Sequence, residues 1–170
     1  LHAGAAILGV AFLAKAPAWP LGFWLPRTYD AANPPSAAMF AIMTKVGIYA
    51  ILRLGLLCFG VDAGPSAGFG WAWVFIAGLM TLAVGLVGML GVRDLGRMAG
   101  YSVLVSAGTL LAAMTFRNEA VLAGALLYMM ISTLAAAGFY LLGGLIGADG
   151  SDGFEEPSLV ESYDPEGDGL

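Results

Sequence analysis

Five long apolar segments follow one another along the chain, separated by short connections rich in Pro, Gly and Asp. A helix needs about 20 apolar residues to cross the hydrocarbon core of a bilayer, and each segment is close to that length. Their near-continuous hydrophobicity is unlike an amphipathic helix of a soluble protein or an alternating barrel strand. The pattern predicts an all-α polytopic membrane protein with about five transmembrane helices, near Ala3–Leu25, Pro35–Phe59, Phe69–Val92, Ala99–Phe116 and Val121–Ile146.

The C-terminal stretch differs in composition from the rest of the chain. Residues 149–170 hold eight of the 12 acidic residues, whereas the remainder holds seven Lys and Arg against four acids. Such a polar stretch buries too little apolar surface to fold by itself. We therefore predict a transmembrane helix bundle over residues 1–148 and an acidic loop or tail over residues 149–170. Because the chain opens inside an apolar run without Met, we expect it to be a fragment of a longer protein.

The polar residues exclude several classes of function. Basic residues neither cluster nor interleave with exposed aromatic residues, so no nucleic acid is expected as a partner. The single cysteine, Cys58, allows no internal disulfide and no Cys-x-x-Cys metal or redox site. Segment 91–100 lacks the Gly-Lys-Ser/Thr ending of a phosphate loop. The sequence thus predicts neither a metal site nor a cofactor. It predicts that the helices are surrounded by the lipid bilayer.

Arginines in the connections predict the orientation. Cytoplasmic connections of membrane proteins carry an excess of basic residues. One side of the predicted bundle has three arginines and the other has two, namely Arg27, Arg93 and Arg97 against Arg53 and Arg117. This count predicts that the first side, and the acidic segment, face the cytoplasm. The expected location is a bacterial inner membrane.

Two lysines lie within predicted spans. Lys45 is ten residues beyond Pro35, which puts it roughly 15 Å into a core about 30 Å thick. Lys15 lies in the middle of the first span. A lysine at this depth costs a few kcal/mol and must face a protein interior or a wet cavity, where it can load and release a proton. Alternatively, each lysine binds helix-end carbonyls or reaches a headgroup, although the depth makes that a long reach. We interpret both lysines as a proton relay.

A helix break is predicted directly after Lys15. Pro17 and Pro20 each remove a backbone donor and clash with the preceding turn. Freed carbonyls at membrane depth are tolerated only beside a cavity or other protein, and broken helices beside charged residues form the ion sites of transporters. An ordinary proline kink is the simpler interpretation of the prolines taken alone.

Hydroxyl groups within the spans are candidates for extending the relay. Tyr49 follows Lys45 by one turn and is either part of a hydrogen-bonded chain or an ordinary packed aromatic residue. Ser106, Ser132 and Thr133 offer a possible hydroxyl path, although most such groups bond their own helix backbone. Glycines within the spans, such as Gly78 and Gly138, are expected to permit close helix packing.

No Asp or Glu falls within the five predicted spans. Two lysines without an intramembrane carboxylate leave their charge unbalanced. We therefore expect the acidic partners in segments outside this chain or in a neighbouring membrane subunit.

The residues around these lysines resemble a known family. Residues 15–54 contain Lys-x-Pro-x-x-Pro-Leu-x-x-Trp-Leu-Pro and Thr-Lys-Val-Gly-x-Tyr. Both strings are similar to the central helices of the proton-antiporter membrane-subunit family, which comprises the antiporter-like subunits of respiratory complex I and the large subunits of Mrp/Pha-type antiporters. The resemblance continues through residues 93–110 and 126–146, and is greatest to the D-type subunits of the Mrp/Pha multisubunit antiporters.

The resemblance implies a fold of about fourteen helices with two inverted five-helix repeats that contain broken helices. It implies that Lys15 lies on the first broken helix and pairs with a glutamate outside this chain. It also implies that Lys45 is the central lysine that passes protons laterally. This chain departs from many family members in the fifth span, which lacks a titratable group at Ile131, Ser132 and Ala136. Water and the hydroxyls of Ser132 and Thr133 could bridge this gap.

The leading hypothesis is a proton-translocating membrane subunit of a multisubunit Na⁺ or K⁺/proton antiporter, which is a transporter and not an enzyme. Its expected partners are other membrane subunits, protons and Na⁺ or K⁺. The alternative is an antiporter-like subunit of a proton-pumping NADH:quinone oxidoreductase or related hydrogenase. A third is a non-transporting membrane scaffold, which the lysines disfavour. The first two share the same lysine chemistry, so the lysines do not separate them.

Overall fold

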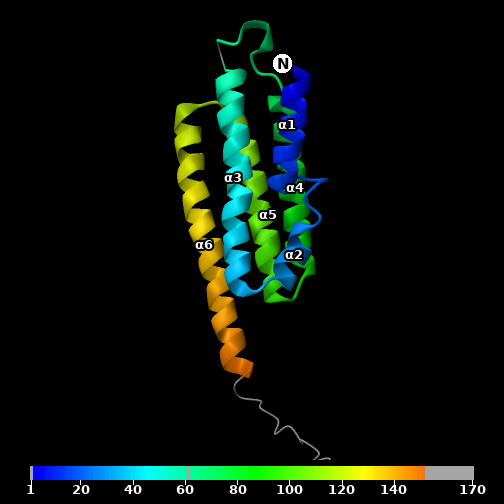
Figure 1. The fold of residues 1–170 in the computed structure, drawn as a ribbon, viewed down its shortest axis with the longest axis vertical. Coiled ribbons are helices and arrows are strands. Elements are labelled where there is room, and N and C mark those ends of the chain that lie inside the picture. The colour runs from blue at the N-terminus through cyan, green and yellow to red at the C-terminus, as the bar shows by residue number, and fades with distance from the viewer. Residues whose placement is uncertain (1, 61, 152–170) are drawn as a thin grey trace, which may run out of the picture.

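The computed structural model describes residues 2–60 and 62–151, and within these ranges every element is a helix (Figure 1). Of the tail predicted over residues 149–170, all but the end of the last helix lies outside the described residues. In chain order the elements are α1 His2–Lys15, α2 Leu25–Ala31, α3 Pro34–Cys58, the 3₁₀ turn η1 Gly64–Ser66, α4 Trp71–Gly91, α5 Leu95–Ala113, the 3₁₀ turn η2 Met114–Phe116 and α6 Glu119–Ser151.

Helix length confirms the prediction of an all-α polytopic membrane protein. Four helical segments are long and apolar enough to cross a membrane, namely Pro34–Cys58, Gly64–Gly91, Leu95–Phe116 and Glu119–Ile146. They run alongside one another, and α1 and α2 lie one above the other beside them (Figure 1). The predicted five passes therefore correspond to these four helical segments and to one interrupted pass made of α1 and α2.

The first pass is not the continuous helix that its hydropathy suggests. α1 has 14 residues, or about 21 Å at 1.5 Å per residue, which is shorter than the hydrocarbon core. It ends at Lys15, and the chain is irregular until α2 begins at Leu25. The break predicted at Pro17 and Pro20 is confirmed, and it removes the middle of the pass from helical structure.

The irregular segment is held by backbone and side-chain bonds. The amide of Ala18 donates to the carbonyl of Leu13 at 2.9 Å. The amide of Trp19 donates to the hydroxyl of Thr81 on α4 at 2.8 Å. Thr81 is completely buried, so a neighbouring helix supplies an acceptor to an amide that the break has freed. This is how non-helical backbone persists within a membrane protein.

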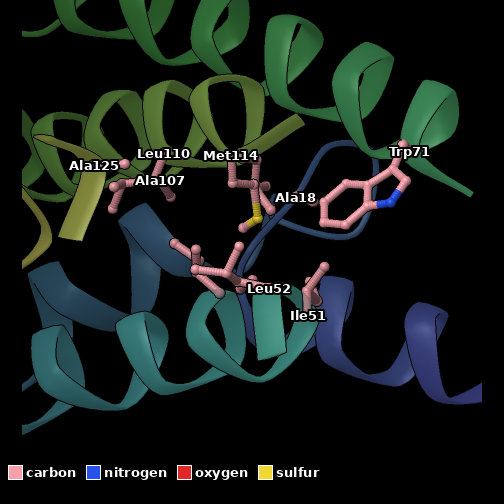
Figure 2. Packing of buried hydrophobic residues seen from close by; sticks show 11 residues of the cluster. Ala18, Ile51, Leu52, Trp71, Ala107, Leu110, Met114 and Ala125 are labelled. Atoms are coloured by element: carbon pink, nitrogen blue, oxygen red, sulfur yellow. The ribbon is translucent and has the colours of Figure 1, made fainter. Parts of the chain in front are cut away.

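Two clusters of buried apolar side chains form the core. The first joins the break to α3, α4, α5 and α6 (Figure 2), and consists of Ala16, Ala18, Ile48, Ile51, Leu52, Trp71, Ala107, Leu110, Leu111, Met114 and Ala125. The second joins α2, the start of α3, the start of α5 and α6, and consists of Leu25, Tyr29, Ala37, Ala38, Ala41, Ala99, Val103 and Tyr140. Alanines are frequent in both, which brings the backbones close together as membrane helix packing requires.

Helices α4 and α5 pack closely through glycine. A Cβ on Gly108 would lie 2.5 Å from the backbone nitrogen of Leu82, and one on Gly78 would lie 2.7 Å from that of Ala112. No side chain fits at either position, so the packing predicted for Gly78 is confirmed. An added Cβ on Gly138, on α6, meets nothing within 4 Å, and the packing expected there is not present in the described chain.

The helices differ greatly in how much of their surface this chain covers. Over its most apolar stretch, α5 is 56% buried, whereas α6 is 6% buried. α5 lies among α3, α4 and α6, which leaves α6 on the outside (Figure 1). The chain therefore has one central helix, α5, and an outer surface that is broadly apolar.

Candidate functional site

Lys45 lies in the interior of the bundle. It stands eleven residues after the start of the 25-residue helix α3, near the middle of the membrane pass. Its side chain is 4% exposed, and its Nζ donates to the Oγ of Ser106 on α5 at 2.5 Å. A buried lysine that faces the protein interior is what the sequence predicted at this position.

Ser106 links Lys45 to the backbone of the central helix. Its side chain is 6% exposed, and its hydroxyl donates in turn to the carbonyl of Val103 at 2.8 Å. The serine oxygen thus accepts from the lysine and donates to the carbonyl. An amine or ammonium has two or three protons, so Lys45 keeps donor capacity beyond this one bond.

The surroundings of Lys45 contain little charge. Helices α3, α4 and α5 contain no Asp or Glu. Thr44 is buried beside Lys45, but its hydroxyl donates to the carbonyl of Ala41 at 2.9 Å. A charge on Lys45 is therefore stabilised by neutral dipoles alone within these helices, and such a charge is costly at membrane depth.

Lys15 is placed differently. It is the last residue of α1, immediately before the break, as predicted. Its side chain is exposed on the described chain, whereas the sequence predicted burial. The reason is helical direction, because the neighbouring Phe12, Leu13 and Ala16 turn toward the first core cluster and Lys15 does not. Lys15 is exposed and Lys45 is buried, so the two side chains do not share one buried site.

Tyr49 also lies outside the buried face of α3 and is 46% exposed. Four residues advance a helix by slightly more than one turn, so each such step rotates the side chain by about 40°. Lys45 is at one edge of the buried face, and this rotation carries Tyr49 past that edge. Its place in a proton relay remains a prediction.

The hydroxyls on α6 bond their own helix. Ser132 donates to the carbonyl of Met129 at 3.2 Å, and Thr133 donates to the same carbonyl at 2.6 Å. Both side chains are half-buried. This is the usual behaviour of such residues in membrane helices, and a path through them also remains a prediction.

Two features of the site were not predicted from the sequence. One is the bond between Thr81 and the amide of Trp19. The other is the buried pair Tyr29 and Tyr140, whose rings are 5.2 Å apart between α2 and α6. The position of Thr81 within an otherwise apolar span was a weak indication that its hydroxyl bonds a backbone group. No local pattern connects residues 29 and 140, which lie far apart in the sequence.

The described geometry defines a class of protein. It is a polytopic helical membrane protein with a broken helix and a lysine buried at mid-membrane depth against a serine of the central helix. Residues 2–156 match the family described as NADH:quinone oxidoreductase/Mrp antiporter, transmembrane. The chain belongs to this family.

Curated relatives come from both branches of the family. The chain is 58% identical over 139 residues to a probable K⁺/H⁺ antiporter subunit, of the D type, from Rhizobium meliloti, covering 82% of this chain and 26% of the relative. It is 32% identical over 145 residues to the D-type Na⁺/H⁺ antiporter subunit of Alkalihalophilus pseudofirmus, covering 85% and 29%. It is 35% identical over 143 residues to the N-type NADH-quinone oxidoreductase subunit of a Parafrankia species, covering 80% and 26%.

A solved structure shares the fold. A chain in the structure of the Mrp complex from a Dietzia species matches with a TM-score of 0.76 and 23% sequence identity, over 85% of this chain and 26% of that chain. The chain therefore spans between a quarter and a third of the length of these relatives.

Proposed function

We propose that this chain is the proton-carrying part of a membrane subunit of a monovalent cation/proton antiporter. One observation carries the proposal: Lys45 is buried at mid-membrane depth and hydrogen-bonded to Ser106. Similarity at 58% identity to a protein named as a probable K⁺/H⁺ antiporter subunit supports the same conclusion.

The proposed chemistry is the loading and release of one proton at the Nζ of Lys45. As an ammonium, Lys45 donates to Ser106, and as a neutral amine it has a lone pair that accepts the next proton. Burial makes the charged form costly without excluding it, because the serine oxygen stabilises it. A proton that arrives from one side and leaves to the other restores the starting state.

Lys15 is proposed as the preceding relay site at the helix break. Its exposed side chain, at the middle of the pass, needs a partner because an unpaired charge facing lipid is expensive. A carboxylate from a segment outside this chain, or from a neighbouring membrane subunit, would meet this need. Tyr49, Ser132 and Thr133 are proposed as hydroxyls beyond Lys45, reached through water.

The proposed location is a bacterial inner membrane, with the α2 end of the bundle in the cytoplasm. Arg27, Arg93 and Arg97 are exposed at that end, and basic residues are enriched on the cytoplasmic side. The acidic segment that follows α6 would then also be cytoplasmic.

The second candidate is a proton-pumping subunit of a redox complex. Similarity at 35% identity to an NADH-quinone oxidoreductase subunit supports it. The higher identity to the K⁺/H⁺ antiporter subunit favours antiport. Flavin and iron–sulfur absorbance in the complex purified through this subunit would favour the redox complex, and its absence together with cation-dependent proton movement would favour the antiporter.

The test is cation-dependent proton movement in everted vesicles from a strain without its own antiporters. The complete operon is expressed as wild type, Lys45→Ala and Arg53→Ala, and the pH gradient is followed after addition of Na⁺ or K⁺. Arg53 is the matched control because it is a basic residue of the same helix whose side chain is exposed.

We expect the rate in Lys45→Ala to fall by about a hundredfold or more, the low end of what a positioned proton-transfer group contributes. Arg53→Ala should retain the wild-type rate. An assembled Lys45→Ala complex that moves protons as fast as wild type would make Lys45 structural and the proposal wrong.

A further inference from the structure

A second polar site lies among the apolar residues next to Lys45. Tyr29 on α2 is 2% exposed and Tyr140 on α6 is 7% exposed. Their rings are tilted by 43° with centroids 5.2 Å apart. The hydroxyl of Tyr140 has no hydrogen-bond partner among the described residues, and the hydroxyl of Tyr29 has only the side chain of Thr44 beside it. Buried hydroxyls in native proteins are nearly always bonded to protein or to water, so the unbonded hydroxyl of Tyr140 beside Tyr29 needs an explanation.

A third hydroxyl lies next to that of Tyr29. The side chain of Thr44 lies beside the hydroxyl of Tyr29, and it is 2% exposed. Because Thr44 donates its proton to the carbonyl of Ala41, its oxygen is left to act as an acceptor. Two tyrosine hydroxyls that can donate or accept, and one threonine oxygen that accepts, match the three hydrogen bonds that a buried water usually makes.

The second site adjoins the first. Thr44 immediately precedes Lys45 on α3. Val103, whose carbonyl accepts from Ser106, belongs to the same buried cluster as the two tyrosines. That cluster extends to α2, at the lower end of the bundle (Figure 1). The tyrosine pair therefore lies between Lys45 and the end of the bundle at which α2 is placed.

We propose that Tyr29, Tyr140 and Thr44 hold a buried water that connects the Lys45 site toward the α2 end of the bundle. The inference rests on the proposed function, because it gives the proton on Lys45 a route on that side. A proton from the α2 end binds this water, and a different proton of the same water passes on toward the neutral amine of Lys45, so the water and the three hydroxyl groups end with the protons they began with. The tyrosines position the water and stay neutral.

The alternative is that both hydroxyls are simply tolerated in an apolar cluster. The two explanations predict opposite effects of removing them. A tolerated, unbonded hydroxyl destabilises the fold, so its removal raises the thermal midpoint, whereas a hydroxyl bonded to water stabilises it.

The experiment uses the complete complex carrying Tyr29→Phe, Tyr140→Phe or both, beside wild type and Lys45→Ala. Tyr128→Phe is the matched control, because Tyr128 is on the same helix as Tyr140 but is 39% exposed. Cation-dependent proton movement is measured per assembled complex over a range of cation concentrations. The thermal midpoint of the purified complex is measured in parallel.

For the double variant we expect the maximal rate to fall about tenfold, equivalent to the loss of one hydrogen bond. The cation concentration at half the maximal rate should stay unchanged, the thermal midpoint should fall, and Tyr128→Phe should match wild type. A purely structural role would lower the midpoint and the amount of complex but leave the rate per complex intact, which would overturn the inference.

The outcomes also separate the inference from the proposed function. If wild type is active, Lys45→Ala is inactive and the double variant retains its full rate, the water route is wrong and the function of Lys45 stands. If wild type moves no protons with either cation, the proposed function is wrong. A raised thermal midpoint in the double variant overturns the bound water in either case.

Discussion

Lys45 and Lys15 both lie within membrane passes, but this chain buries the side chain of Lys45 and leaves that of Lys15 exposed. Lys45 is 4% exposed and has Ser106 as an acceptor on the central helix. Lys15 is exposed at the end of a short helix, beside an irregular segment. The comparison shows that depth in the membrane and burial within the chain are separate properties. At Lys45 this chain supplies burial and a hydrogen-bond acceptor, whereas at Lys15 it leaves the side chain exposed.

The difference follows from which helix faces are covered. α3 packs against α1, α5 and α6, and Lys45 is on the face of α3 that is buried. α1 packs mainly on α3, and Lys15 is on a part of its surface that the described chain leaves exposed. We therefore expect perturbations at Lys45 to act through this chain's own packing, and perturbations at Lys15 to act through its neighbours.

Ser106→Ala should have the largest effect among changes that leave both lysines in place. It removes the acceptor of Lys45, which should lower the rate of cation-dependent proton movement about tenfold and destabilise the fold by about 1–3 kcal/mol. Thr109→Val is the control, because Thr109 is on the same helix and bonds only the carbonyl of Val105. Equal rates in the two variants would show that Ser106 does not stabilise the charged lysine.

Thr81→Val should act on the region of Lys15. The substitution keeps the shape of the side chain but removes the acceptor of the Trp19 amide, which should cost about 1–3 kcal/mol. Limited proteolysis and the thermal midpoint of the purified complex are the measurements, with cleavage expected within residues 16–24. An unchanged midpoint and an unchanged cleavage pattern would contradict the view that α4 holds the break.

The smallest effect on the fold is expected for a cysteine at position 15. In a Cys58→Ser background, Lys15→Cys should react readily with a membrane-permeant maleimide in the solubilised subunit separated from its partners. Lys45→Cys should react far more slowly under the same conditions because that side chain is buried. Similar reaction rates at the two positions would remove the distinction between them.

Much of the fold was accessible to sequence reasoning, for physical reasons. Long apolar segments predict the transmembrane helices directly, because backbone polar groups in lipid must form their hydrogen bonds within a helix. Pro17 and Pro20 predict the helix break, because proline lacks the backbone N–H that donates a helical hydrogen bond. The predicted span from residue 35 to 59 differs from α3 by one residue at each end. Local chemistry decides these features, so a single sequence contains them.

The candidate site was harder to predict from the sequence, because it depends on the direction in which each side chain points from its helix. Hydropathy places Lys15 and Lys45 at similar depth, but only packing shows that one turns inward and the other outward. Ser106 was one of several candidate hydroxyls, and nothing in its local sequence singles it out as the partner of Lys45. The Tyr29–Tyr140 pair joins residues from α2 and α6, and no periodicity within either helix indicates it.

The most direct test of the central claim compares Lys45→Arg with Lys45→Met in the complete complex. Arginine keeps the charge and a donor for Ser106 but does not release its proton at physiological pH, whereas methionine has neither. If Lys45 must load and release a proton, both assembled variants will lose cation-dependent proton movement. If the assembled Lys45→Arg complex retains the wild-type rate while Lys45→Met does not, a fixed charge is sufficient, and the account of Lys45 as a proton relay is contradicted.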